Sequence, residues 1–301
     1  MAPLKALIFG ATGAVARHCA KEALRHDNVS LTLALRDPNK PIPDLPSSLP
    51  RVQADLTDPT SLRSAVQASG ATSAFIYAQG RHRDKEQMKA SIAALADAGV
   101  THIVLLSSWT IYPLSIDDAY AQGDEHAIPA KHAAAEIALR EVKERYPDLR
   151  YAAVRPLYFA TNVLFEDLSR GEVNVLNPAG GWDYISSEDI GTVCGRLLVD
   201  GVEGVVPIVG PRILSQSEAW GIIGRVLGKE IRVKDVTEKE FLKGSEEPMM
   251  KSLARNRHRS DEEKYPTDLV SEARANMRRY VGSEGMGFEE WATRHKGEFK
   301  Q

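Results

Sequence analysis

Residues 4–16 read LKALIFGATGAVA, a short apolar run that ends in a glycine turn and continues into a helical pattern. A buried strand that turns directly into a helix explains this order of residues. Gly10 permits the sharp turn, and Gly13 lets the backbone approach a pyrophosphate at the positive end of the helix. Ala16 takes the third, helix-packing position of the glycine motif. The residues expected to bind a dinucleotide here are Gly10, Thr12, Gly13, Ala14 and Val15.

The order of strand and then helix repeats along the first half of the chain. Further strands are expected at residues 29–35, 51–54, 73–78, 102–106 and 151–155, and helices near 59–69, 84–98 and 130–146. Such alternation predicts βαβ units and a parallel sheet with helices on both faces. We therefore expect an α/β, doubly wound Rossmann fold with residues 1–155 as the nucleotide-binding core. Residues 156–301 should complete the sheet and form a smaller C-terminal substrate-binding part.

Composition excludes several classes of protein. The 301 residues include 38 basic and 41 acidic ones, so the chain lacks the positive excess that binding to a nucleic-acid backbone requires. The only cysteines, Cys19 and Cys194, have no metal-ligand spacing and are too few for a disulfide framework, so no metal site is expected. No apolar window approaches the length of about 18 residues that a membrane span needs. We expect a soluble, cytoplasmic protein that acts on a small molecule.

The end of the second expected strand indicates which nucleotide binds. Arg36 lies 23 residues after Gly13, and Asp37 follows it. Arginine at this place favours a 2′-phosphate, so the order favours NADP(H) over NAD(H), although Asp37 would compete if the strand ended one residue later. A solvated Arg36 without a ligand is the alternative. Further cofactor contacts are expected from residues that follow the third and fourth strands: Asp55, Leu56, Ala78 and Gln79.

A set of motifs spread over about residues 1–230 carries a family resemblance. They are the 10–16 turn, Arg36-Asp37-Pro38, Ala54-Asp55-Leu56, Leu106-Ser107-Ser108, His132-Ala133-Ala134-Ala135-Glu136, Arg155-Pro156-Leu157-Tyr158 with Asn162, and Tyr184-Ile185-Ser186-Ser187-Glu188-Asp189-Ile190. In this order they resemble the NmrA-like atypical short-chain dehydrogenase/reductase family. Beyond residue 240 no resemblance is found.

The resemblance implies a Rossmann fold of the short-chain dehydrogenase type that binds NADP(H). The family includes NADPH-dependent quinone and dye reductases, isoflavone-reductase-like enzymes, redox-sensing regulators and fungal secondary-metabolism enzymes. By the same resemblance, Pro156 and Tyr158 are expected on the nicotinamide side of the cofactor, and Asn162 in the substrate pocket.

The wider superfamily moves hydride with a Tyr-x-x-x-Lys pair, which this chain lacks. Counting back from Glu136 puts His132 in the lysine position and Ile128 in the tyrosine position. The sequence therefore predicts a substrate that needs little acid help, with His132, Tyr112 or Ser108 as proton donor. His132 could donate near neutral pH. The structural alternatives are a helix-face hydrogen bond for His132, a pocket wall for Tyr112 and a strand-end cap for Ser108.

Three functions compete. The expected one is an NADPH-dependent reductase of a small conjugated or aromatic substrate such as a quinone, enone or imine. The second is a sensor that binds NADP(H) without turnover and contacts a protein partner. The third is a non-redox acid/base enzyme, for example for a cyclisation or condensation, that keeps NADP(H) as a structural cofactor.

The charged stretch at residues 244–266 is expected to be a solvated loop or helix face, with a mobile pocket cover as the alternative.

Overall fold

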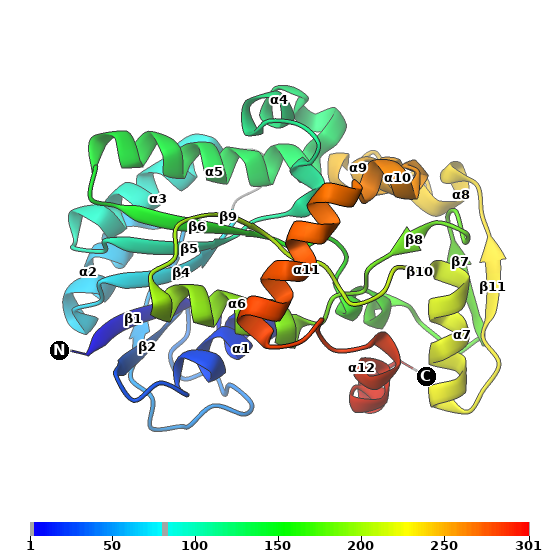
Figure 1. The fold of residues 1–301 in the computed structure, drawn as a ribbon, viewed down its shortest axis with the longest axis horizontal. Coiled ribbons are helices and arrows are strands. Elements are labelled where there is room, and N and C mark those ends of the chain that lie inside the picture. The colour runs from blue at the N-terminus through cyan, green and yellow to red at the C-terminus, as the bar shows by residue number, and fades with distance from the viewer. Residues whose placement is uncertain (1–2, 80–83, 301) are drawn as a thin grey trace. The chain divides into compact units, whose positions relative to one another are not determined.

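A parallel sheet dominates the computed structural model, which describes residues 3–79 and 84–300 (Figure 1). The strand order is β3-β2-β1-β4-β5-β6-β9, and the pairings that join β1 to β6 are all parallel. The order reverses between β1 and β4, as in other doubly wound sheets. The expected fold is thus confirmed. Its strands are β1 (Leu4–Phe9), β2 (Val29–Leu35), β3 (Arg51–Gln53), β4 (Ser73–Tyr77), β5 (His102–Leu106), β6 (Arg150–Arg155) and β9 (Gly204–Pro207).

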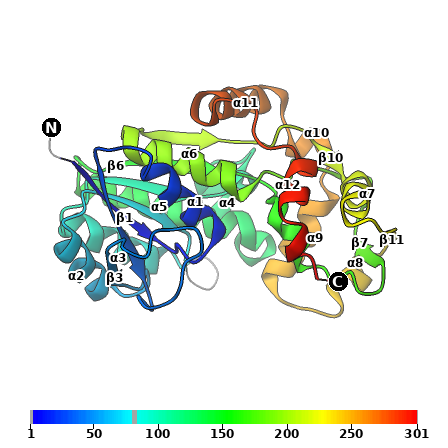
Figure 2. The same ribbon diagram turned by 90° about the horizontal axis from the view of Figure 1, so that it is seen from below.

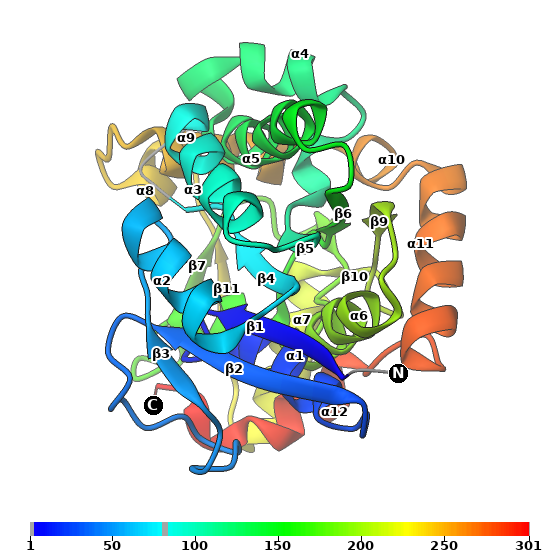
Figure 3. The ribbon, with the colours of Figure 1, turned by 90° about the vertical axis from the view of Figure 1, so that its left-hand side faces the viewer.

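Helices cover both faces of this sheet (Figure 3). One face carries α2 (Pro59–Ser69), α3 (Lys85–Asp97) and α5 (Ala127–Arg145), which bury Leu62, Ile92 and Leu139 in one core cluster with strand residues. Local chemistry sets the helix ends: Asp58 and Asp84 cap α2 and α3 by accepting backbone N–H bonds, and Gly70 closes α2 in the left-handed conformation.

The other face carries α1 (Ala14–Ala23) and α6 (Ser187–Asp200), which run side by side (Figure 2). They approach closely because α6 presents glycine to α1. A Cβ atom at Gly191 would lie 2.4 Å from the Cβ of His18 and 2.7 Å from the carbonyl oxygen of Val15. Any side chain at Gly191 would therefore push α6 away from the helix that follows the glycine turn.

The chain divides into two compact units. The first holds the sheet and comprises residues up to 121, 129–155 and 188–206, and the second comprises 122–128, 156–187 and 207–301. The first unit also contains a 3-10 turn, η1 (Trp109–Ile111), and the short helix α4 (Ile116–Ala121), neither of which was expected from the sequence. Among the described residues, no helix is both long and apolar enough to span a membrane.

The second unit has two small sheets. In it β11 (Arg232–Asp235) pairs in parallel with β7 (Glu172–Val175), and β10 (Leu214–Ser215) pairs antiparallel with β8 (Gly181–Trp182). Its helices are α7 (Gln216–Leu227), α8 (Glu238–Leu242), α9 (Pro248–His258), α10 (Asp261–Lys264), α11 (Thr267–Val281) and α12 (Phe288–Arg294). A 3-10 segment, η3 (Ala160–Phe165), also belongs to this unit.

The charged stretch 244–266 is not wholly solvated, contrary to the sequence-based expectation. It forms α9 and α10, and two of its cations are buried. Lys264 donates to the carbonyl oxygen of Gly181 at 2.7 Å, and Arg257 donates to the side chain of Gln216 at 2.5 Å. Buried cations of this kind need such partners, and these come from sequence-distant segments.

Gly191→Ala should destabilise the first unit by about 1–3 kcal/mol, because the added methyl group overpacks the contact between α1 and α6. Gly221→Ala is the matched control, since a Cβ there meets only the Arg225 Nη1 atom at 3.9 Å. This exposed α7 position should gain up to about 1 kcal/mol from the higher helix propensity of alanine. Urea unfolding measures both changes. Equal effects at the two positions would contradict the close approach.

Candidate functional site

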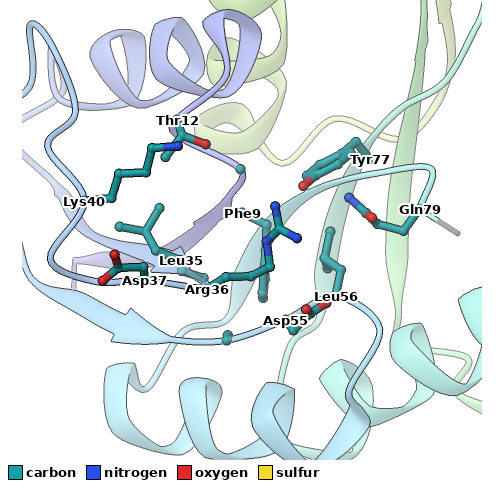
Figure 4. A pocket seen from close by; sticks show the side chains of 13 residues that line it. Phe9, Thr12, Leu35, Arg36, Asp37, Lys40, Asp55, Leu56, Tyr77 and Gln79 are labelled. Atoms are coloured by element: carbon teal, nitrogen blue, oxygen red, sulfur yellow. The ribbon is translucent and has the colours of Figure 1, made fainter.

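A cavity of about 440 Å³ opens beyond the carboxyl ends of β1, β2, β3 and β4 (Figure 4). Ligands of open parallel sheets bind in this crevice, where the strand order reverses. Its wall contains six residues that the sequence assigned to the cofactor: Gly10, Thr12, Arg36, Asp55, Leu56 and Gln79. Further side chains in the wall were not assigned to the cofactor, among them Phe9, Leu35, Lys40 and Tyr77.

The glycine turn forms a cradle of backbone atoms in which there is no room for a side chain at Gly10. Gly10 has φ +76°, and a Cβ atom there would lie 2.6 Å from Cε1 of Tyr77. The N–H of Gly13 donates to the Gly10 carbonyl at 2.8 Å, which closes the turn directly before α1. Among the residues that the structure describes, no side chain caps the N-terminus of α1, and its first turn carries no acidic residue. The amides at this end are therefore suited to an anion such as a pyrophosphate.

Six predicted cofactor residues do not line the cavity, and four of them belong to the first unit. Gly13 is the N-cap of α1, and Ala14 and Val15 are its first residues, so they belong to the turn through their backbone. Ala78 is buried in the core on the α2 and α3 face of the sheet. The strand β4 ends at Tyr77, so the alternation of side chains along the strand turns Tyr77 and Gln79 to the cavity and Ala78 away from it.

Two cations and one acid follow β2 at the rim of the cavity. Figure 4 shows the Arg36 side chain pointing into the cavity, while Lys40 stands on the opposite side, near Thr12. The carboxylate of Asp37 accepts the N–H of Asn39 at 2.9 Å, so it is engaged in its own turn. Since β2 ends at Leu35, Arg36 takes the place directly after the strand. The described rim thus presents positive charge to a ligand.

Asp55 and Tyr77 line the same cavity, but the first side chain is charged and the second is neutral. The N–H and hydroxyl of Thr57 donate to the Asp55 carboxylate at 2.9 and 2.8 Å. Despite partial burial, these bonds and the nearby Arg36 hold the pKa of Asp55 below its ordinary value. Burial raises the pKa of the Tyr77 phenol, although Arg36 opposes that effect. The cavity wall is therefore anionic at Asp55 and a neutral hydrogen-bonding aromatic at Tyr77.

The predicted nicotinamide-side residues belong to the second unit. Pro156 follows β6 and is buried. Tyr158 is also buried: its ring centroid lies 4.6 Å from that of Trp182, and its hydroxyl accepts a bond from Arg257 at 3.4 Å. These contacts place Tyr158 in the aromatic core of that unit. Its contact with a cofactor stays a prediction.

Ser108 follows β5 and caps η1. Its side chain accepts the N–H of Thr110 at 3.2 Å and shares a hydrogen bond with the Thr110 hydroxyl at 2.9 Å. The Ser108 side chain is buried, and its hydroxyl takes part in both of these hydrogen bonds. Ser108 thus caps the 3-10 segment η1, whereas the alternative expected from the sequence was a cap of the strand end, and a role in proton transfer stays a prediction.

His132 lies on α5 and is neutral at physiological pH. Burial lowers the pKa of its imidazole to about 3, and the nearby Lys131 and Arg155 act in the same direction. Its buried Nδ1 atom has no hydrogen-bond partner among the described residues. The low pKa argues against proton donation by the imidazolium form near neutral pH, and a role of His132 in proton transfer stays a prediction.

A buried ion pair lies beside His132 and joins three elements of the first unit. Arg155, at the end of β6, donates from Nε and Nη2 to the two carboxylate oxygens of Glu136 on α5, at 2.8 and 2.7 Å. The hydroxyl of Ser107, directly after β5, donates to the same carboxylate at 2.5 Å. Arg155 also stands over the ring of Tyr112, 4.6 Å from its centroid. The sequence motif thus marks a charge network instead of a Tyr-x-x-x-Lys pair.

His132→Gln should make the protein less sensitive to acid. In the unfolded chain a histidine binds a proton below its ordinary pKa of 6.5, whereas folded His132 stays neutral down to about 3. The unfolded state therefore binds more protons in this window, and stability falls as the pH drops from about 6.5 towards 3. Urea unfolding at a series of pH values should show a shallower loss for the variant. Identical pH dependence in both proteins would contradict the neutral state of His132.

Comparisons with known proteins agree with this geometry. A family model described as NAD(P)H-binding matches residues 10–200. A nitrogen metabolite regulation-like protein of Gibberella fujikuroi, bik4, is 35% identical over 322 aligned residues, which cover 96% of each chain.

Two solved structures have a similar fold. The NADPH-dependent quinone oxidoreductase QOR2 of Escherichia coli, complexed with NADPH, has a TM-score of 0.73 at 16% identity over 96% of this chain and 99% of that one. Nmra, a negative transcriptional regulator, has a TM-score of 0.68 at 14% identity over 96% of this chain and 95% of that one. The chain therefore belongs to the NAD(P)H-binding family, in its NmrA-like atypical short-chain dehydrogenase/reductase group, and its cofactor is a nicotinamide dinucleotide.

Proposed function

We propose that the protein is an NADPH-dependent reductase of a small conjugated substrate, such as a quinone, an enone or an imine. The observation that carries this proposal is the cavity at the switch point. It combines an uncapped helix N-terminus behind the Gly10 cradle with two cations, Arg36 and Lys40, at the end of β2. That donor set fits a dinucleotide with a pyrophosphate and an additional phosphate group.

The preference for NADPH over NADH rests on the rim of the cavity. A 2′-phosphate needs cationic donors where NADH would offer a ribose hydroxyl to an acid. Arg36 and Lys40 supply two such donors, and the only acid directly after β2, Asp37, already accepts the N–H of Asn39. Asp55 and Leu56 then lie beyond β3, where the adenine would be held.

The substrate class follows from the residues around the charge network. When bound, NADPH would supply a hydride, that is one proton with two electrons. The protein must position the acceptor, exclude water and supply one proton. With no Tyr-x-x-x-Lys pair and a neutral His132, this chain is suited to acceptors whose conjugation stabilises the reduced anion. The fold likeness to a quinone oxidoreductase supports this class.

A regulator that binds NADP(H) without turnover is the second candidate. The relative with 35% identity over 96% of the chain bears the name of a nitrogen metabolite regulation-like protein, and that observation favours it. Such a protein would use the same cavity but would pass on the state of its cofactor through a protein partner. Turnover separates the two candidates.

Arg36→Ala and Lys40→Ala should each weaken NADPH binding by about 10- to 100-fold, because each removes a charge-assisted hydrogen bond to a phosphate. The affinity for NADH should change little. Isothermal titration calorimetry with both cofactors measures the ratio. Arg63→Ala is the control, since this α2 arginine lies 3.6 Å from Asp97 and does not line the cavity. An unchanged ratio in both cavity variants would refute the 2′-phosphate assignment.

The purified protein should oxidise NADPH in the presence of at least one acceptor from a panel of quinones, enones and imines. Loss of the near-ultraviolet absorbance of NADPH measures the rate, with chromatography of the reduced product as confirmation. If calorimetry shows NADPH binding while no acceptor is reduced, the reductase proposal fails and the regulator takes its place.

A further inference from the structure

Tyr112 occupies an unusual place at the carboxyl edge of the sheet. It follows η1, which begins two residues after Ser107 at the end of β5. Its neighbours Trp109 and Ile111 are fully buried, whereas Tyr112 is partly exposed. The Trp109 ring meets it edge-on, with 5.5 Å between ring centroids. Tyr112 is thus a partly exposed phenol, packed against Trp109, in the segment that follows the carboxyl end of β5.

Arg155 is the cation beside this phenol. Its guanidinium carbon lies 4.6 Å from the centre of the Tyr112 ring. Burial alone would lower the pKa of Arg155. Its hydrogen bonds and charge attraction to Glu136 outweigh burial, and a hydrogen bond and charge attraction to Tyr112 act in the same direction, so the pKa of Arg155 is raised above its ordinary value. Because interaction energies are mutual, a charge that Tyr112 helps to hold on Arg155 also favours the ionised form of Tyr112.

Glu136 orients this cation without covering it. Nε and Nη2 of Arg155 are directed at the Glu136 carboxylate, which Ser107 also approaches. This bidentate contact fixes the plane of the guanidinium and leaves Nη1 outside the pair. Other ionisable groups on the neighbouring elements include His132 and Lys131 on α5, and Asp117, Asp118 and Tyr120 on α4. His132 is uncharged at neutral pH, so it does not compete with Arg155 for the phenolate.

We propose that Tyr112 is the proton donor of the reaction and that Arg155, held by Glu136 and Ser107, is the positioning residue that activates it. This inference rests on the proposed reductase function and names its acid. Arg155 donates to the phenol oxygen, and a phenol oxygen can accept one hydrogen bond while donating its own proton. Arg155 thereby has the role of the lysine in a Tyr-x-x-x-Lys pair. It lies on β6, whereas the lysine of that pair lies one helical turn after the tyrosine.

The proton balance of the step is simple. The Oη–H bond of Tyr112 breaks, and a new O–H bond forms on the reduced oxygen of the acceptor, or an N–H bond where the acceptor is an imine. The electrons come with the hydride, so Tyr112 is neither oxidised nor reduced. The tyrosinate that remains lies beside the Arg155 charge and takes a proton back from water.

A spectroscopic titration tests the pairing without any turnover. Tyrosinate absorbance in the near ultraviolet is recorded against pH for the wild-type protein and Tyr112→Phe, and the difference reports Tyr112 alone. We expect ionisation below the ordinary tyrosine pKa, as for groups beside an opposite charge. Tyr146→Phe is the opposite-sign control, because its hydrogen bond to Asp97 raises the pKa of Tyr146.

Removal of the charge tests the role of Arg155. Replacing Arg155 alone would strand the Glu136 carboxylate in the core, so the double variant Glu136→Gln with Arg155→Met removes both charges and keeps the volume. Circular dichroism checks its fold. In the double variant, Tyr112 should ionise at or above the ordinary tyrosine pKa. Ionisation of Tyr112 at the same pH with and without Arg155 overturns the inference.

Kinetics tests the proton donor. Tyr112→Phe should lower kcat for quinone reduction by about 100-fold, the lower end of the range for general acids, with little change in KM and with loss of the high-pH limb of the kcat profile. Tyr146→Phe should leave kcat unchanged. An unchanged kcat and pH profile in Tyr112→Phe overturns the donor role. A wild-type protein that reduces no acceptor refutes the proposed function and the donor role together, while a normal Tyr112 titration refutes the inference alone.

Discussion

The buried contact between Glu136 and Arg155 is the interaction on which the carboxyl edge of the sheet depends. Taking two charges out of water costs several kcal/mol per ion, and only full hydrogen bonding offsets that cost. Here two bonds from Arg155 and one from Ser107 satisfy the Glu136 carboxylate. The three residues come from α5, β6 and the end of β5, so the pair ties these elements together. Loss of either charge alone would leave the other uncompensated.

Two regions at the carboxyl edge of the sheet differ in the interactions that they use. In the region near β2, binding relies on backbone and on exposed charge: a glycine cradle, free amides at the start of α1, and the solvated cations Arg36 and Lys40. Such charges are partly screened by salt, and their value lies in selecting a phosphate. In the region near β5 and β6, the charges are buried, and they change the protonation of their neighbours. The neutral state of His132 is one result.

Local patterns in the sequence were sufficient for the parts that depend on local chemistry. The 10–16 turn, the strands and the caps of α2 and α3 are encoded by short-range spacing, and so is the position of Arg36 after β2. Contacts between residues that are far apart in the sequence could not be predicted from these patterns. Glu136 and Arg155 are 19 residues apart, and Lys264 finds its partner Gly181 83 residues away. Without these pairings, a charge run such as 244–266 resembles a solvated surface, and His132 resembles an ordinary titrating histidine.

Arginine suits the network for reasons that lysine cannot match. A guanidinium offers five donors in a plane, so it can engage a carboxylate with two nitrogens and still present its face to an aromatic ring, whereas an ammonium is a compact point charge. Arg155 has this double contact with Glu136 and Tyr112. A guanidinium also stays charged through the whole range in which enzymes work. If Arg155 supports the Tyr112 phenolate, as inferred, that support is independent of pH, and only the phenol itself titrates.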